Sequence, residues 1–82
     1  MINILMPNNA LKRPEIIKEY KISRRETWVL ELLYEGLSNK AIAERLFITT
    51  ATVKFHLTNI YKKFKVKSRL ELSSKLRSLG FV

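Results

Sequence analysis

The sequence predicts an all-α domain of four helices, or of five if a short segment near the N-terminus is also helical. Apolar residues recur at intervals of three and four along several segments. Residues with this spacing lie on one face of a helix, the face that an amphipathic helix buries. Ser23 and Ser68 each begin a Ser-x-x-Glu sequence, which is typical of a helix start. The only two glycines, Gly36 and Gly80, fall where predicted helices end. With 82 residues, the chain has room for one small core.

The N-terminal part is predicted to be an extension over residues 1–21, followed by a folded domain over residues 22–82. Pro7 lies beside two asparagines in a turn-like stretch, and we expect residues 1–13 to be flexible. Pro14 suits the first turn of a short helix from Glu15 to Tyr20. We expect this helix to dock loosely on the domain.

The next helix begins at a predicted capping box, Ser23-Arg24-Arg25-Glu26, in which Glu26 reaches back to the Ser23 amide. Trp28 is predicted to be a partly buried packing residue at the side of this helix. Gly36 ends the helix as a C′ glycine. The predicted buried stripe consists of Val29, Leu32 and Leu33.

The central stretch reads as a short helix, a turn and a longer helix. Ser38 is the expected N-cap of a helix from Asn39 to Leu46. Phe47 and Ile48 then form the turn, and a threonine at position 49 or 50 caps the long helix. This spacing is typical of a helix-turn-helix, whose second helix enters the DNA major groove by its N-terminal end.

The long helix has two faces of different character. At 100° per residue, one stripe is apolar and predicts a core contact, and it consists of Val53, Leu57, Ile60 and Phe64. The opposite face places an aromatic residue among small, polar and basic ones, namely Ala51, Phe55, Thr58, Asn59 and Lys62, with Lys54 on the flank. An aromatic side chain on this face adds little to folding, so it favours a binding role.

A last helix is predicted from Arg69 to about Leu79, after a second capping box formed by Ser68-Arg69-Leu70-Glu71. Leu72, Leu76 and Leu79 form one stripe that we expect to complete the core. A different side is a candidate for contact with another chain or is simply solvated, and it carries Leu70, Ser73, Ser74 and Arg77.

The charge is strongly positive and unevenly distributed. Sixteen basic residues against seven acidic ones give a net charge of +9 and an isoelectric point of about 10.2. Residues 54–82 contain eight basic residues and one acidic residue, a net charge of +7, whereas residues 1–53 carry +2. Such a patch favours a polyanionic partner, because each neutralised phosphate releases condensed counterions. A solvated basic face is the alternative.

Composition argues against several other classes of function. The chain has no cysteine and no aspartate, and His56 is its only histidine. The chain therefore lacks the residues that a zinc site, a nucleophilic cysteine or a Ser-His-Asp triad requires. It also has no glycine-rich phosphate loop. We expect no enzyme activity, no metal and no cofactor. No apolar run approaches the roughly 20 residues of a membrane span, so we expect a cytoplasmic protein.

Four groups of residues keep the spacing of a known family. They are Ile22-Ser23-x-Arg25-Glu26-x-x-Val29-Leu30-x-Leu32, Gly36-Leu37-Ser38-Asn39-Lys40-x-Ile42-Ala43-x-x-Leu46, Thr52-Val53-Lys54-x-His56 and Val66-Lys67-Ser68-Arg69. From Ile22 to its C-terminal region, the chain resembles the LuxR-type (GerE-like) helix-turn-helix of bacterial transcription factors. The resemblance implies four helices, the third of which reads double-stranded DNA.

The resemblance also implies roles for single residues. Lys54, Phe55 and Thr58 match base-contact positions, with Asn59 as a further candidate, and the helical wheel independently places Phe55 and Thr58 on the outer face. Thr58 is expected to contact a base edge or a phosphate. Backbone phosphates would be held by Lys40, Thr50, Thr52 and Lys62.

The family commonly dimerises through its fourth helix, which would place Leu70, Ser73, Ser74 and Arg77 in a homodimer interface on DNA. His56 is expected to pack or to contact phosphate. The chain departs from the family in its bulky Phe55 and in Phe64-Lys65, where Leu-Gly is common. The resemblance therefore specifies neither the target sequence nor the turn after the long helix.

Several alternatives remain open from the sequence. The domain could be a protein-interaction module that binds another regulator or RNA polymerase through Phe55 and the last helix. It could also bind nucleic acid, including RNA, without sequence preference. Lys12 and Arg13 of the extension could touch DNA, and Arg24 and Arg25 could meet phosphate. The chain could be a stand-alone regulator or the effector end of a longer protein.

Overall fold

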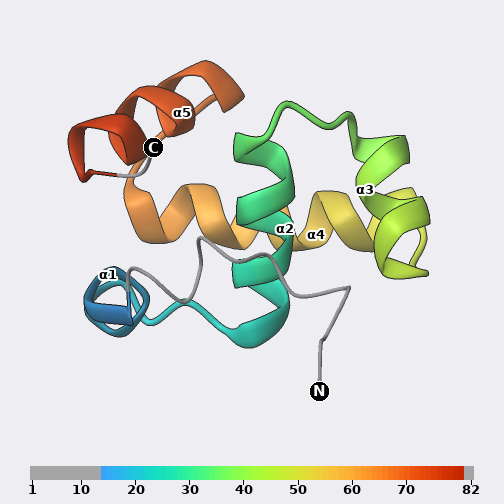
Figure 1. Ribbon diagram of the computed structural model, residues 1–82, viewed down its shortest axis with the longest axis horizontal. Coiled ribbons are helices and arrows are strands. Elements are labelled where there is room, and N and C mark those ends of the chain that lie inside the picture. Colours follow the sequence, from blue (N-terminus) through green and yellow to red (C-terminus); the bar gives the residue numbers. More distant parts are fainter. Residues whose placement is uncertain (1–13, 81–82) are drawn as a thin grey trace.

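The structure, a computed structural model, describes residues 14–80. The predicted flexible stretch of residues 1–13 and the arm residues Lys12 and Arg13 lie outside this range. Within it the chain is all-helical, as predicted, and the short N-terminal helix is present as well (Figure 1). The helices are α1 (Pro14–Glu19), α2 (Arg24–Tyr34), α3 (Asn39–Leu46), α4 (Thr50–Phe64) and α5 (Arg69–Ser78).

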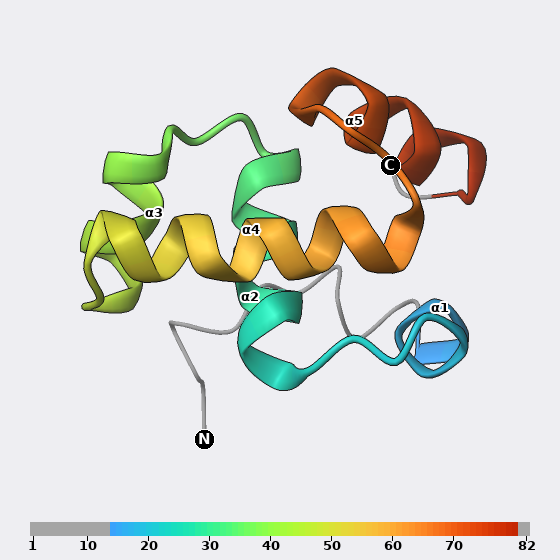
Figure 2. The ribbon, with the colours of Figure 1, turned by 180° about the vertical axis from the view of Figure 1, so that it is seen from behind.

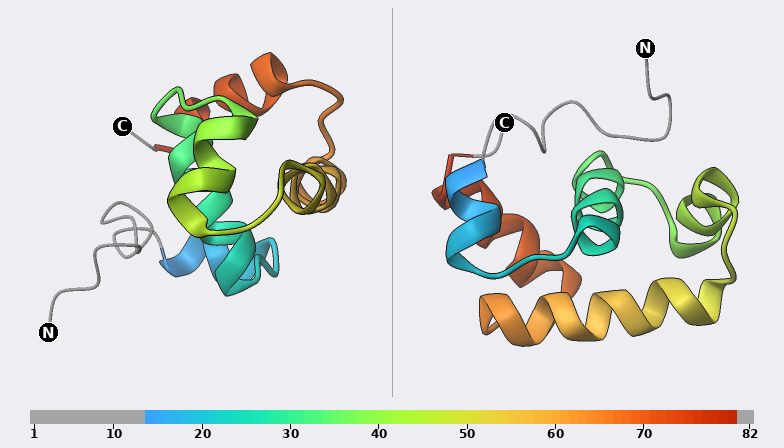
Figure 3. Two further views of the ribbon diagram at one scale, coloured as in Figure 1. Left: turned by 90° about the vertical axis from the view of Figure 1, so that its right-hand side faces the viewer. Right: turned by 90° about the horizontal axis from the view of Figure 1, so that it is seen from below.

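The longest helix, α4, lies along one side of the molecule. Seen from behind, α4 crosses in front of α2 near the middle of its length (Figure 2). Two further views place α1, α2, α3 and α5 on the same side of α4 (Figure 3). α4 packs against α2, α3 and α5, so that it is held from one side, while none of the other helices covers its far side.

The helix starts follow the predicted caps. Ser23 and Glu26 form the full capping box, with N–H···O distances of 3.1 Å to the serine hydroxyl and 2.9 Å to the carboxylate. Ser38 and Thr49 cap α3 and α4, each accepting a backbone N–H at 3.1 Å. Each cap satisfies an amide that has no partner inside its helix.

The second predicted capping box is only half correct. The Ser68 hydroxyl accepts the Glu71 amide at 3.1 Å, as expected. The Glu71 carboxylate, however, accepts the amide of Lys67 at 2.9 Å instead of the Ser68 amide. The Glu71 side chain therefore satisfies the amide of the residue before the N-cap, and this bond joins the α4–α5 linker to the first turn of α5.

The core lies between α4 and the four helices beside it. The predicted stripes of α2 and α4 are buried, as are Leu72 and Leu76 of α5. The buried residues of α3 are Ile42, Ala43 and Leu46. Leu30 and Glu31 are buried too, at 2% and 1% exposed, although neither belongs to the predicted stripe of α2. α2 packs against both α3 and α4, so more than one of its sides is covered.

α1 is anchored to the domain by two apolar contacts. Ile16 is 6% exposed within the core, and the ring of Tyr20 stacks on Phe64 of α4 with centroids 4.5 Å apart. The segment thus extends the core at the C-terminal end of α4. None of the described helices combines the length and the hydropathy that crossing a bilayer requires.

Candidate nucleic-acid interface

The outer face of α4 is the side opposite its buried stripe. Val53, Leu57, Ile60 and Phe64 are between 0% and 6% exposed, so they fix the helix against the core. The outer face is exposed at Ala51, Lys54, Phe55, Thr58 and Lys62, whereas Asn59 is half-buried at its edge. Phe55 is 63% exposed. This arrangement confirms the faces that helical periodicity predicts, while the roles of these residues stay predictions.

The hydroxyl of Thr58 is already engaged with the helix backbone. Its Oγ1 lies 3.0 Å from the carbonyl oxygen of Lys54, four residues earlier. A carbonyl oxygen only accepts, so the threonine hydroxyl donates its hydrogen here. Lys54 itself is exposed.

Three threonines surround the first turn of α4. Thr49 is the N-cap, and its Oγ1 lies 2.9 Å from that of Thr52, which is half-buried. Thr50 opens the helix and is exposed. The N-terminus of a helix carries unpaired amides and a partial positive charge, so this turn suits an anion. Lys40 on α3 and Lys62 in the last turn of α4 are also exposed.

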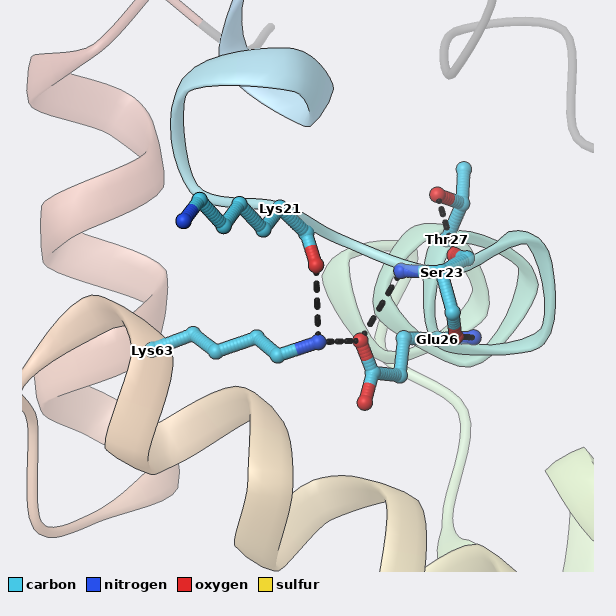
Figure 4. A network of polar contacts seen from close by, with 5 residues as sticks. All are labelled: Lys21, Ser23, Glu26, Thr27 and Lys63. Atoms are coloured by element: carbon cyan, nitrogen blue, oxygen red, sulfur yellow. Dashed lines mark hydrogen bonds and ion pairs between the residues drawn. The ribbon is translucent and has the colours of Figure 1, made fainter.

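A polar network fixes the C-terminal half of α4 to the start of α2 (Figure 4). The ammonium of Lys63 lies 2.5 Å from Oε1 of Glu26 and 2.8 Å from the carbonyl oxygen of Lys21. The same Oε1 accepts the Ser23 amide. Through Lys63, α4 is joined to the capping box of α2.

The charge of Glu26 is stabilised by its neighbours. Burial alone would raise the pKa of this carboxyl, but the hydrogen bonds from Lys63 and from the Ser23 amide, with the lysine charge, outweigh burial and lower the pKa below 4.5. Glu26 therefore remains ionised at neutral pH, as the Lys63 contact requires.

A second polar contact orients α5. The guanidinium of Arg69 donates to the carbonyl oxygen of Leu37 and lies 3.4 Å from Oδ1 of Asn39. It joins the start of α5 to the loop between α2 and α3. Leu70, Ser74 and Arg77 are exposed on this helix, with Leu70 at 77%, whereas Ser73 is half-buried. The candidate dimer face is therefore largely open.

Trp28 takes the partly buried packing position that the sequence predicts, whereas the choice between packing and phosphate contact for His56 stays a prediction. His56 is half-buried, and its ring meets the ring of Phe55 edge to face with centroids 5.7 Å apart. Trp28 is half-buried against the core, and the guanidinium of Arg25 lies 5.9 Å from its ring. Arg24 and Arg25 are exposed.

Phe47 lies in the predicted turn, and its exposure at the surface was not predicted. It is 82% exposed, and it ends α3 with φ of 58°, in the left-handed region. A bulky residue at positive φ is uncommon. Its position was the only signal in the sequence that could have indicated this exposure. Phe47 directly follows α3 and ends it in the left-handed conformation.

Together these features define a helix-turn-helix domain in which α3 and α4 form the motif. Comparison with known proteins gives the same result. Residues 21–76 match the family described as bacterial regulatory proteins of the luxR family. The match covers more than half of the chain, and the chain belongs to this family.

Similar curated proteins are bacterial regulators. The chain is 49% identical over 51 residues to the nitrate/nitrite response regulator protein NarL of Escherichia coli strain K12, covering 62% of this chain and 24% of NarL. It is 38% identical over 58 residues to the HTH-type transcriptional regulator MalT of Vibrio campbellii, covering 71% of this chain and 6% of MalT. The chain thus spans a quarter or less of these relatives. No solved structure matches it.

Proposed function

We propose that this domain is a sequence-specific binder of double-stranded DNA that regulates transcription, with α4 inserted in the major groove. The observation that carries the proposal is the outer face of α4. A lysine, a phenylalanine and a threonine are exposed there, at Lys54, Phe55 and Thr58, on a helix whose other face is fixed in the core. The major groove admits one α-helix, and the other helices lie on one side of α4 and leave its outer face uncovered.

Each proposed base contact has a chemical rationale. Lys54 donates hydrogen bonds to O6 and N7 of guanine, and the ring of Phe55 lies against the methyl group of thymine. Thr58 and Asn59 meet base edges further along the groove. Asn59 is half-buried at the edge of the face, so its contribution is smaller.

The phosphate contacts set the register of the helix in the groove. Thr50 and Thr52 in the first turn of α4, Lys40 on α3 and Lys62 near the end of α4 supply them. Such contacts position a protein and carry no sequence information. The net charge of +9 supports them, because phosphate binding releases counterions.

We further propose that two copies meet on DNA through α5. Leu70, Ser74 and Arg77 are exposed, and two of them are polar or charged. This face is too polar for a strong hydrophobic seam, so the dimer is expected on DNA rather than in dilute solution. A contact with RNA polymerase or another regulator through Phe55 and α5 is the alternative function.

Two lysine variants test base reading against phosphate binding. Lys54→Ala should relax preference at one base position and cost about 5- to 100-fold in affinity for the preferred site. Lys62→Ala removes the same charge and should weaken binding to all sequences alike, lowering the slope of log affinity against log salt by about 1. Fluorescence anisotropy with specific and scrambled duplexes measures both.

The two variants serve as controls for each other, because each removes one exposed lysine from α4. If Lys54→Ala weakens specific and scrambled duplexes by the same factor, α4 does not read bases through this residue. If neither variant changes DNA binding, DNA reading by α4 is wrong and the alternative function, protein interaction, is favoured.

A further inference from the structure

The hydrogen-bonding state of Thr58 limits which bases it reads. Its hydroxyl donates to the carbonyl oxygen of Lys54 at 3.0 Å, so its single hydrogen is committed to the backbone. The two lone pairs of Oγ1 remain, and the residue is exposed on the outer face. In this state Thr58 only accepts hydrogen bonds.

In the middle of α4, acceptor oxygens are offered by Thr58, which is exposed, and by Asn59, which is half-buried at the edge of the outer face. Between positions 54 and 62 the exposed residues are Lys54, Phe55, Thr58 and Lys62. The lysines are donors without an acceptor, and phenylalanine has neither. α4 contains no acidic residue that could accept from a base. Thr58 therefore complements the donors around it.

We infer that Thr58 reads an exocyclic amino group, N6 of adenine or N4 of cytosine, and does not contact a phosphate. In the major groove these amino groups are the base-pair donors, whereas O6 and N7 of guanine and O4 of thymine are acceptors. A phosphate oxygen is likewise an acceptor, and it would face the lone pairs of Oγ1. The inference rests on the proposed function and adds a base class to it.

Lys54 and Thr58 lie one helical turn apart on the same face of α4, so their side chains should reach neighbouring positions in the groove. Lys54 selects an acceptor, guanine, and Thr58 selects a donor next to it. The preferred site should thus combine guanine with an adjacent adenine or cytosine. Which strand carries each base follows from the docking angle.

The test begins with selection from random duplex DNA by the full chain and by two variants. Thr58→Val keeps the shape of the side chain and removes the hydroxyl, while Thr58→Ser keeps the hydroxyl and its bond to the backbone. The wild type and Thr58→Ser should enrich adenine or cytosine at one position. Thr58→Val should lose that preference and keep the others.

Base analogues then identify the atom. Replacing that adenine by purine, or that cytosine by 2-pyrimidinone, removes only the exocyclic amino group. Affinity of the wild type should fall about 3- to 10-fold, and Thr58→Val should be indifferent. The same replacement at an unselected position controls for weaker base pairing.

The outcomes separate this inference from the proposed function. If the wild type enriches a motif and Thr58→Val enriches the same motif, or if Thr58→Val loses affinity equally for all sequences, the assignment of Thr58 is wrong and the proposed function stands. If Thr58→Val loses preference for guanine or thymine, the hydroxyl donates, and the assignment is also wrong. If the wild type enriches nothing, the proposed function itself fails.

Discussion

Lys65 ends α4 in a left-handed conformation, with φ of 58°. At the ends of α2 and α5, glycine adopts positive φ instead, at Gly36 and Gly80. Lysine has a Cβ that disfavours this region, whereas glycine does not. The chain thus keeps a tight turn after α4 although Phe64-Lys65 replaces the Leu-Gly common in the family.

The position of Lys65 leads to a stability prediction at the residue scale. Lys65→Gly should raise the free energy of unfolding by about 0.5 to 1 kcal/mol, because relief of the left-handed strain exceeds the added entropy of the unfolded chain. Urea denaturation followed by circular dichroism measures the change. Lys65→Ala is the matched control, since it removes the same charge and keeps the Cβ. A glycine variant no more stable than the alanine variant would contradict the account.

At the scale of elements, the capping residues and apolar stripes were predictable because they depend on local spacing. Ser23 and Ser38 cap helices where the sequence places them, and Thr49, one of the two threonines that the sequence offered, caps α4. Burial of Leu30 and Glu31 was not predictable, because a helical wheel does not show that α2 has neighbours on more than one side. The outer face of α4 was predictable for the converse reason, since it depends on one helix alone.

The ion pair between Glu26 of α2 and Lys63 of α4 could not be predicted from the sequence. Glu26 and Lys63 are far apart in the chain, and only packing brings their charged atoms to 2.5 Å. The sequence indicated Glu26 solely as part of the capping box. The single carboxylate therefore has two functions, one local and one between helices.

This bridge predicts a dependence of stability on pH. Folding lowers the pKa of Glu26. The ionised carboxylate therefore contributes fully to the free energy of unfolding above pH 4.5, the ordinary pKa of the group, and this contribution is lost as the pH falls through the lower pKa of the folded state. Glu26→Gln should destabilise the domain by about 1 to 3 kcal/mol at pH 7, and the difference from the wild type should shrink below pH 4.5.

Urea denaturation at a series of pH values checks this result. Glu19→Gln is a suitable control, because Glu19 is exposed and also lies outside the Lys63 network. A constant difference between Glu26→Gln and the wild type from neutral to acidic pH would show that the carboxylate charge does not hold α4 in place.

At the scale of the whole molecule, charge and shape favour the same partner. The net charge of +9 includes +7 over residues 54–82, which contain most of α4 and all of α5. The other helices lie on one side of α4, so its basic and aromatic outer face is available to a large ligand. Duplex DNA matches both properties, since it offers a groove wide enough for a helix and a dense array of phosphates.

Selection from random duplex DNA by the purified chain tests whether α4 reads DNA sequence. A domain that reads sequence should enrich a motif and bind it about a thousandfold or more tightly than competitor DNA, with affinity falling steeply as salt rises. Binding without an enriched motif would contradict sequence reading. No binding at any salt concentration would contradict a DNA-binding role for this domain.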